Sequence, residues 1–171
     1  MKKLLFIILF NAFFIFSFAK ILKNNNILDS LDIIHYGINL RMDSLSNKKI
    51  VGNTVVTYKS KVEGLTYIVL DLYEFNIDSV FLGGTKTDNY VYSDNKLKVY
   101  FSEKNTNDIG VLNIYYRGLA KTEGWGGFYI TSDNNYAFNM GVGMSSNPHS
   151  IGRYWYPCID DFKEKAQYSY S

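Results

Sequence analysis

Cysteine, proline and histidine are scarce in this chain. It has one cysteine, Cys158, two prolines, and two histidines, His35 and His149. A single cysteine cannot form an internal disulfide, so an apolar core has to hold the fold together. A zinc site takes three or four His, Cys, Asp or Glu ligands, usually with two at close spacing, and no H-E-x-x-H occurs here. We therefore expect no metal site within the chain.

Net charge is also low. The 18 basic and 16 acidic residues leave a formal charge of +2, for which Lys2 and Lys3 account entirely. A chain without a positive field cannot neutralise phosphates, so nucleic acid is not an expected partner.

Long apolar runs are absent except at the N-terminus. The run 4–19 follows two lysines and ends with Ser17 and Ala19, small residues at the −3 and −1 positions before Lys20. This pattern predicts a secretory signal peptide over 1–19, followed by a leader segment over 20–31. The alternative is an uncleaved membrane anchor, but the run is shorter than the roughly 20 residues of a spanning helix. We expect export to the periplasm or the medium, with no stable membrane span after cleavage.

Aromatic and β-branched residues dominate the rest of the chain, which favours strands. In "DIIHYGINLRMD", the alternation places Ile34, Tyr36, Ile38, Leu40 and Met42 on one face of a strand. Further strands are expected over 54–61, 65–72, 77–82, 89–92, 96–101, 111–117, 127–131 and 136–140. Short strands separated by Gly, Asn and Asp turns predict an all-β fold, an antiparallel sandwich or an open barrel, over residues 32–171.

From Gly141 the alternation stops, and a loop rich in glycine and aromatic residues follows. Cys158 follows a proline among large apolar residues, which favours a buried thiol, although a Cys–His pair is not excluded. His35 is expected at the surface, and His149 bonded to the backbone of its own loop. Asp160 and Asp161 are adjacent and so point apart. A short helical turn capped by either one, with an ion pair to Arg153 or Lys165, explains them as well as acid–base chemistry. Charge-assisted bonds of Arg153, Asp160 and Lys165 are expected to fix this corner of the chain.

The closing stretch "GRYWYPCIDDFKEKAQYSY" resembles the signature that ends the N-terminal domain of the aminopeptidase N family of zinc metallopeptidases. The matching positions are Arg153, Tyr156, Pro157, Cys158, Asp160, Lys165, Ala166 and Tyr168. Three earlier segments, "HYGINLRMD", "GNTVVTYKS" and "GLA…GGFYITS", are similar to family strands in the same order. The loop before the signature is most similar to exported bacterial members.

The resemblance implies a sandwich or saddle-shaped β-domain that packs on a thermolysin-like catalytic domain in cis and walls its substrate cleft. In the family that second domain carries the zinc ligands, so zinc is implied for the full-length parent enzyme and this chain should be inactive alone. Many members bind the free amino group of a peptide substrate through a Gln-x-Glu pair before the signature arginine. Ser146 and Pro148 stand at those positions here. Asn147 and His149 are the candidate substitutes.

In the family, the domain continues beyond the Lys–Ala–aromatic strand, whereas this sequence stops within it. The resemblance therefore implies a domain that is incomplete at its C-terminal end, from a fragment or a truncated gene product. Two other functions stay open from the residues alone. One is a stand-alone secreted binding module for a ligand, carbohydrate or protein, and the other is a non-catalytic scaffold.

Overall fold

A computed structural model describes residues 27–42, 44–124, 126–145, 147 and 149–171. The predicted signal peptide, and with it most of the expected leader, lies outside this range, as do Ser146 and Pro148. The elements are α2 Ile27–Ser30, β1 Leu31–Arg41, β2 Lys49–Ser60, β3 Leu65–Asp71, β4 Asn76–Leu82, β5 Thr85–Thr87, β6 Tyr90–Ser93, β7 Lys96–Lys104, β8 Ile109–Leu119, β9 Thr122–Glu123, β10 Gly126–Ile130, β11 Ala137–Asn139, the 3₁₀ turn η1 Gly152–Tyr154, and β12 Gln167–Tyr170.

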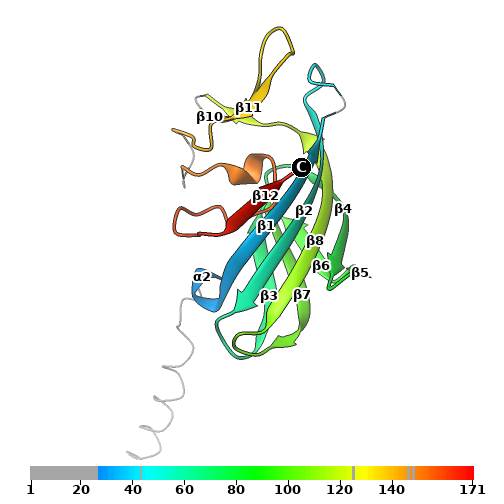
Figure 1. Cartoon of the computed structure of the whole chain (residues 1–171), viewed down its shortest axis with the longest axis vertical. Helices are drawn as coiled ribbons and strands as arrows, with labels where there is room; N and C mark the ends of the chain where they lie inside the picture. The colour runs from blue at the N-terminus through cyan, green and yellow to red at the C-terminus, as the bar shows by residue number, and fades with distance from the viewer. Residues whose placement is uncertain (1–26, 43, 125, 146, 148) are drawn as a thin grey trace, which may run out of the picture.

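The strands form three sheets (Figure 1). The largest has the order β12-β1-β2-β8-β4-β5, and two three-stranded sheets have the orders β3-β7-β6 and β11-β10-β9. Every pairing is antiparallel except the parallel pair β1–β12. The all-β, antiparallel sandwich is therefore confirmed, with one parallel strand at its edge.

The core lies between the six-stranded sheet and the β3-β7-β6 sheet. Their inward residues form one apolar cluster that includes Val56, Tyr58, Ile68, Leu97 and Ile114, all fully buried. Strand alternation produces this arrangement, because every second side chain of β2 points inward while the others face outward. The strict alternation noted in the sequence is thus the direct cause of the two-layer fold.

Two large rings fit into this core because glycines face them across the sheet. A Cβ at Gly52 would overlap the ring of Tyr116, and a Cβ at Gly110 would overlap the ring of Tyr58. Only a residue without a side chain can lie beneath a tyrosine ring that is packed flat on its strand.

One expected face of β1 is wrong. The register shifts between Ile33 and His35, so Ile33 joins Tyr36 and Ile38 in the core while Ile34 is only half-buried. A β-bulge adds one residue to the strand and inverts the alternation on one side of it. The sequence pattern therefore predicts the buried face correctly downstream of the bulge and incorrectly upstream of it.

Tight turns join the hairpins at the positions that the sequence indicated. Gly83 and Gly84 have φ values of 57° and 86° between β4 and β5, and Asp94 and Asn95 have φ values of 51° and 60° between β6 and β7. Two consecutive left-handed residues match the twist of a hairpin. The short helical turn expected at Asp160 or Asp161 is present as a single turn, in which the Glu164 N–H donates to the Asp161 carbonyl at 3.0 Å. Within the described ranges, no helix is long and apolar enough to span a membrane.

Candidate functional site

The closing segment folds into a corner that begins with η1. Gly152 opens this turn where space is limited, because a Cβ there would lie 3.0 Å from both the Cys158 Sγ and the Tyr156 hydroxyl oxygen. Pro157 and Cys158 follow and are buried. We call residues 152–160 the signature corner, since they contain most of the motif noted in the sequence.

A buried ion pair joins the two ends of the signature corner. The Arg153 Nη1 donates to the Asp160 Oδ2 at 2.8 Å, and their side chains are 14% and 4% exposed. The Asp160 carboxylate also accepts from the Gly152 backbone N–H at 3.0 Å. Burial raises the pKa of Asp160, while the Arg153 guanidinium and the backbone N–H groups of Arg153 and Gly152 oppose the rise. Because the Asp160 carboxylate accepts from several donors of its own loop, its role is to hold that loop in shape.

Asp71, at the end of β3, fastens the signature corner to the sandwich. Its backbone exchanges two hydrogen bonds with Cys158, at 2.6 and 3.1 Å. Its carboxylate accepts from the Asp160 N–H at 3.1 Å and pairs with the ammonium of Lys96. Sequence reasoning missed Asp71, because nothing in the local pattern of β3 marks a residue that pairs with a loop 87 positions away.

Cys158 has the environment of a structural thiol. It is 2% exposed and has no disulfide. Burial raises its pKa, and the nearby carboxylates of Asp160 and Asp71 raise it further. A reactive cysteine needs the opposite surroundings, cationic and partly open to solvent. The interpretation of Cys158 as a small buried hydrophobe is confirmed.

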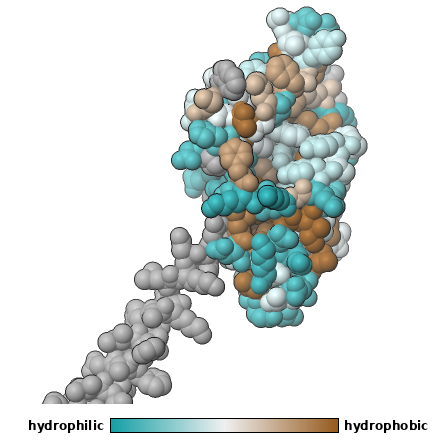
Figure 2. Space-filling model, turned by 60° about the vertical axis from the view of Figure 1, so that its left-hand side comes forward, coloured by the Kyte–Doolittle hydropathy of each residue, from teal (hydrophilic) through white to brown (hydrophobic). Residues whose placement is uncertain are grey.

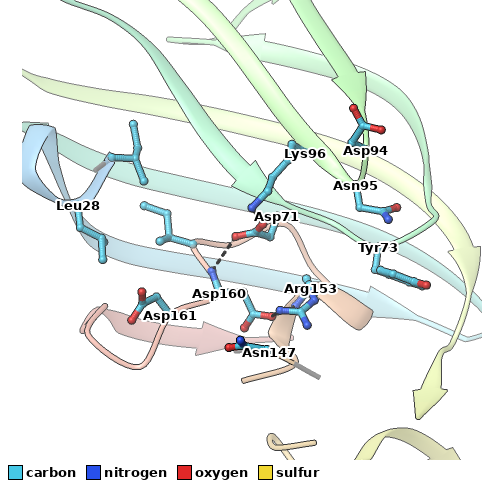
Figure 3. A pocket seen from close by; sticks show the side chains of 12 residues that line it. Leu28, Asp71, Tyr73, Asp94, Asn95, Lys96, Asn147, Arg153, Asp160 and Asp161 are labelled. Carbon is cyan, nitrogen blue, oxygen red and sulfur yellow. Dashed lines mark hydrogen bonds and ion pairs between the residues drawn. The ribbon is translucent and has the colours of Figure 1, made fainter. Parts of the chain in front are cut away.

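A hollow of about 440 Å³ opens beside the signature corner (Figure 3). Asp71, Arg153, Asp160 and Asn147 contribute to its polar wall, and Ile27 and Leu28 of α2 contribute to its apolar wall. Of the two candidate amine-binding residues, only Asn147 lines this hollow. The His149 Nδ1 lies 2.9 Å from the Gly143 carbonyl oxygen, so the imidazole is bonded within its own loop, as expected.

The remaining signature residues have different roles. Ala166 is half-buried and packs against the core. Lys165 is exposed, and it forms no ion pair with any described residue, so the expectation that it helps to fix the corner is wrong. Asp161 accepts from the Lys163 N–H at 2.8 Å and caps the single turn. Asp160 and Asp161 therefore point to separate partners rather than forming a carboxylate pair.

The arrangement does not fit a bound metal. In the part of the chain that the structure describes, no three His, Cys, Asp or Glu side chains converge as a set of metal ligands. The buried polar groups of the corner satisfy one another through short hydrogen bonds. The signature corner can therefore hold a loop in place and form one wall of a hollow.

The fold and the signature corner define a class, a β-sandwich closed by a buried arginine–aspartate loop. The family model of the peptidase M1 N-terminal domain matches residues 33–171, and the chain belongs to this family. No curated protein matches it in sequence.

Solved structures show the same fold. An M1 zinc metallopeptidase from Deinococcus radiodurans is 21% identical, with a TM-score of 0.68; the match covers 82% of this chain and 32% of that one. Native yeast LTA4 hydrolase is 22% identical, with a TM-score of 0.62 and coverage of 85% and 23%. The chain thus spans about a third or less of the proteins that it resembles.

Proposed function

We propose that this chain is the N-terminal β-domain of an exported zinc-dependent aminopeptidase. It packs on a thermolysin-like catalytic domain, walls the substrate cleft of that domain, and does not hydrolyse peptides alone. Zinc belongs to the catalytic domain of the parent enzyme. The family match and the exposed apolar surface described next support this proposal.

One row of exposed side chains carries the proposal. Every second residue from the end of the β10–β11 turn onward is large, apolar and exposed; these residues, which we call the apolar ridge, are Tyr136, Phe138, Met140, Val142 and Met144. The face of the molecule drawn in Figure 2 has apolar side chains among hydrophilic ones in its upper half. This is the level at which Figure 1 has β10 and β11. Several exposed large apolar side chains in one short segment make that segment a candidate interaction surface.

The position of the apolar ridge favours a docking role over a role in the core of this domain. β11 pairs only with β10 among the described strands, and Phe138 stacks on Tyr129 at 5.5 Å, so the hairpin is ordered without burying the ridge. The ridge also leads along the chain toward Asn147 and the hollow of the signature corner. A domain docked on the ridge would thus lie near the residue that we propose to contact the substrate amino group.

The first test is the reading frame that follows the codon for Ser171. A continuation, or an adjacent gene, that encodes a zinc domain with H-E-x-x-H supports the proposal, and its absence would support a stand-alone binding or scaffold module. The two polypeptides are then co-expressed. We expect Phe138→Glu to abolish co-purification, whereas Ile109→Glu, at a somewhat more exposed apolar position outside the ridge, should retain it.

Activity supplies the second test. The purified chain with added zinc should release no nitroaniline from aminoacyl-nitroanilides, and robust turnover would contradict the proposal. In the assembled enzyme, Asn147→Ala should raise KM because one polar contact to the substrate amino group is lost. Fractionation of the expressing cells tests export.

A further inference from the structure

The six-stranded sheet has an outer face, which points away from the core. On its strand β8, the side chains of residues 112, 114 and 116 are buried in the core, so those of residues 111, 113 and 115 point outward. Val111 and Tyr115 are each 40% exposed. Exposed apolar side chains in the middle of a paired strand, rather than in a loop, make this face a candidate binding surface.

A row of side-chain amides crosses the same face. The Asn39 Nδ2 donates to the Asn53 Oδ1 at 3.2 Å, and the Asn53 Nδ2 donates to the Asn113 Oδ1. The Asn113 Nδ2 donates in turn to the Tyr115 hydroxyl oxygen at 3.4 Å. We call these three asparagines the amide ladder. A primary amide has two N–H donors and two acceptor lone pairs, and these bonds use one of each on Asn53 and Asn113. The remaining donors and acceptors are held in a fixed orientation for a ligand.

Two aromatic rings border the amide ladder. The ring of Phe81 on β4 meets the ring of Tyr115 edge to face, with centroids 5.7 Å apart and planes at 69°. Phe81 lies opposite Asn113 in the register of β4 and β8, so rings and amides are neighbours. A shallow groove of about 310 Å³ opens at one side, and Asn39, Asn53 and Tyr115 are among the residues that line it.

Charge is absent from the middle of this surface. Residues 51–57 of β2 and 111–115 of β8 include no charged residue. Charged residues stand around it, namely Arg41 on β1, Lys86 on β5 and Arg117 on β8, which pairs with Asp78 at 3.0 Å. An ionic ligand would find no counter-charge at the centre. A neutral ligand with both hydroxyl groups and apolar faces would match the amides and the rings together.

We propose that the outer face binds an extended, neutral oligosaccharide chain at the amide ladder. A sugar ring has C–H groups on its faces and hydroxyl groups at its edges. One sugar therefore packs on the ring of Tyr115, while its hydroxyls bond the remaining N–H groups and lone pairs of Asn53 and Asn113. The ladder crosses three neighbouring strands, a span of about 10 Å. An extended chain stays in contact along such a row, whereas a coiled chain leaves it.

This surface is complete within the described sheet. Each of the strands β1, β2, β8 and β4 is paired on both sides. The amide ladder and its two rings share no residue with the apolar ridge or the signature corner. The inference therefore does not depend on the proposed docking to a catalytic domain.

Isothermal titration calorimetry of the purified chain tests the proposal. Cellohexaose and chitohexaose serve as extended probes, maltohexaose as a coiled probe and hexagalacturonic acid as an anionic probe. We expect an extended probe to bind more tightly than the other two. Tyr115→Ala removes the stacking ring and should weaken binding about tenfold. Ile109→Ala is the matched control, because Ile109 is an exposed apolar residue on the same face of β8, about 20 Å along the strand. It should bind normally, and equal thermal melts show that each variant is folded.

Nuclear magnetic resonance distinguishes a ligand site from amides that only brace the sheet. The side-chain amide signals of Asn53 and Asn113 should shift as the extended probe is added, whereas that of Asn134, in the exposed β10–β11 turn, should not. The proposal would be overturned if neither extended probe binds at millimolar concentration, if Tyr115→Ala binds normally, or if the two asparagine signals stay unchanged. Tighter binding of the coiled or the anionic probe would also overturn it. A dimer of the free chain that Tyr115→Ala dissociates would assign this face to a second copy instead.

Discussion

The same substitution should have opposite effects at two buried tyrosines. Tyr36 and Tyr58 are both fully buried in the core. The Tyr36 hydroxyl accepts from the Ile159 N–H at 3.0 Å and so links the core to the signature corner. The Tyr58 hydroxyl has no hydrogen-bond partner among the described residues. Replacing each tyrosine with phenylalanine removes one oxygen atom and changes the packing very little.

The magnitudes follow from these partners. Tyr36→Phe leaves the buried Ile159 N–H without an acceptor, which should lower the free energy of unfolding by about 1–3 kcal/mol. Tyr58→Phe removes a hydroxyl that is desolvated without compensation, so it should leave stability unchanged or raise it by about 1 kcal/mol. The two variants should therefore differ by about 1–4 kcal/mol, or about 2–16 °C in Tm for a domain of this size.

Urea denaturation followed by tryptophan fluorescence measures both variants under identical conditions. Equal slopes of the unfolding transitions would show that the two variants expose similar surface on unfolding, so that their midpoints compare directly. The reasoning would be refuted if Tyr58→Phe cost as much stability as Tyr36→Phe.

Three further predictions concern the corner and the core. Asp160→Ala leaves Arg153 buried without its partner and should cost about 3 kcal/mol in urea unfolding, against less than about 1 kcal/mol for Asp161→Ala. In Gly152→Ala the added methyl group crowds the Cys158 and Tyr156 side chains, which should lower stability by about 1–3 kcal/mol, seen as a lower Tm. Burial raises the pKa of Tyr58 to about 12, so the native state keeps a proton that the unfolded state releases above pH 10. Tyr58 should therefore contribute a fall of about 2 kcal/mol in stability between pH 10 and 12, in addition to the contributions of the other buried tyrosines, and Tyr58→Phe should remove its share.

The sequence was most informative where local pattern decides the structure. Alternation located the long strands, and left-handed Asn, Asp and Gly residues located their turns. The association of Arg153 with Asp160 followed from the signature motif and is present as a buried ion pair. These features depend on residues close together in the chain, so one sequence contains enough information to predict them.

Long-range features could not be predicted in this way. The β-bulge at Ile33 and His35 is a property of the pairing with β2, so the sequence of β1 alone does not indicate it. The tie between Asp71 and Cys158 and the parallel pairing of β12 join segments that only the folded topology brings together. Lys165 illustrates the opposite case. Its place in the signature motif predicts a charged partner, but the fold leaves its side chain exposed and without an ion pair among the described residues.

The parallel pair β1–β12 has a consequence for how the chain folds. It joins the first and last of the described strands, with contacts such as that between Ser171 and Asn39 spanning 132 residues. Closing so long a loop is entropically costly, so contacts of this kind form late and slow the overall reaction. β1 can pair with β2 early, as a local hairpin, but its other side stays open until β12 arrives. During synthesis, that open backbone is exposed to proteases and to mispairing with other strands.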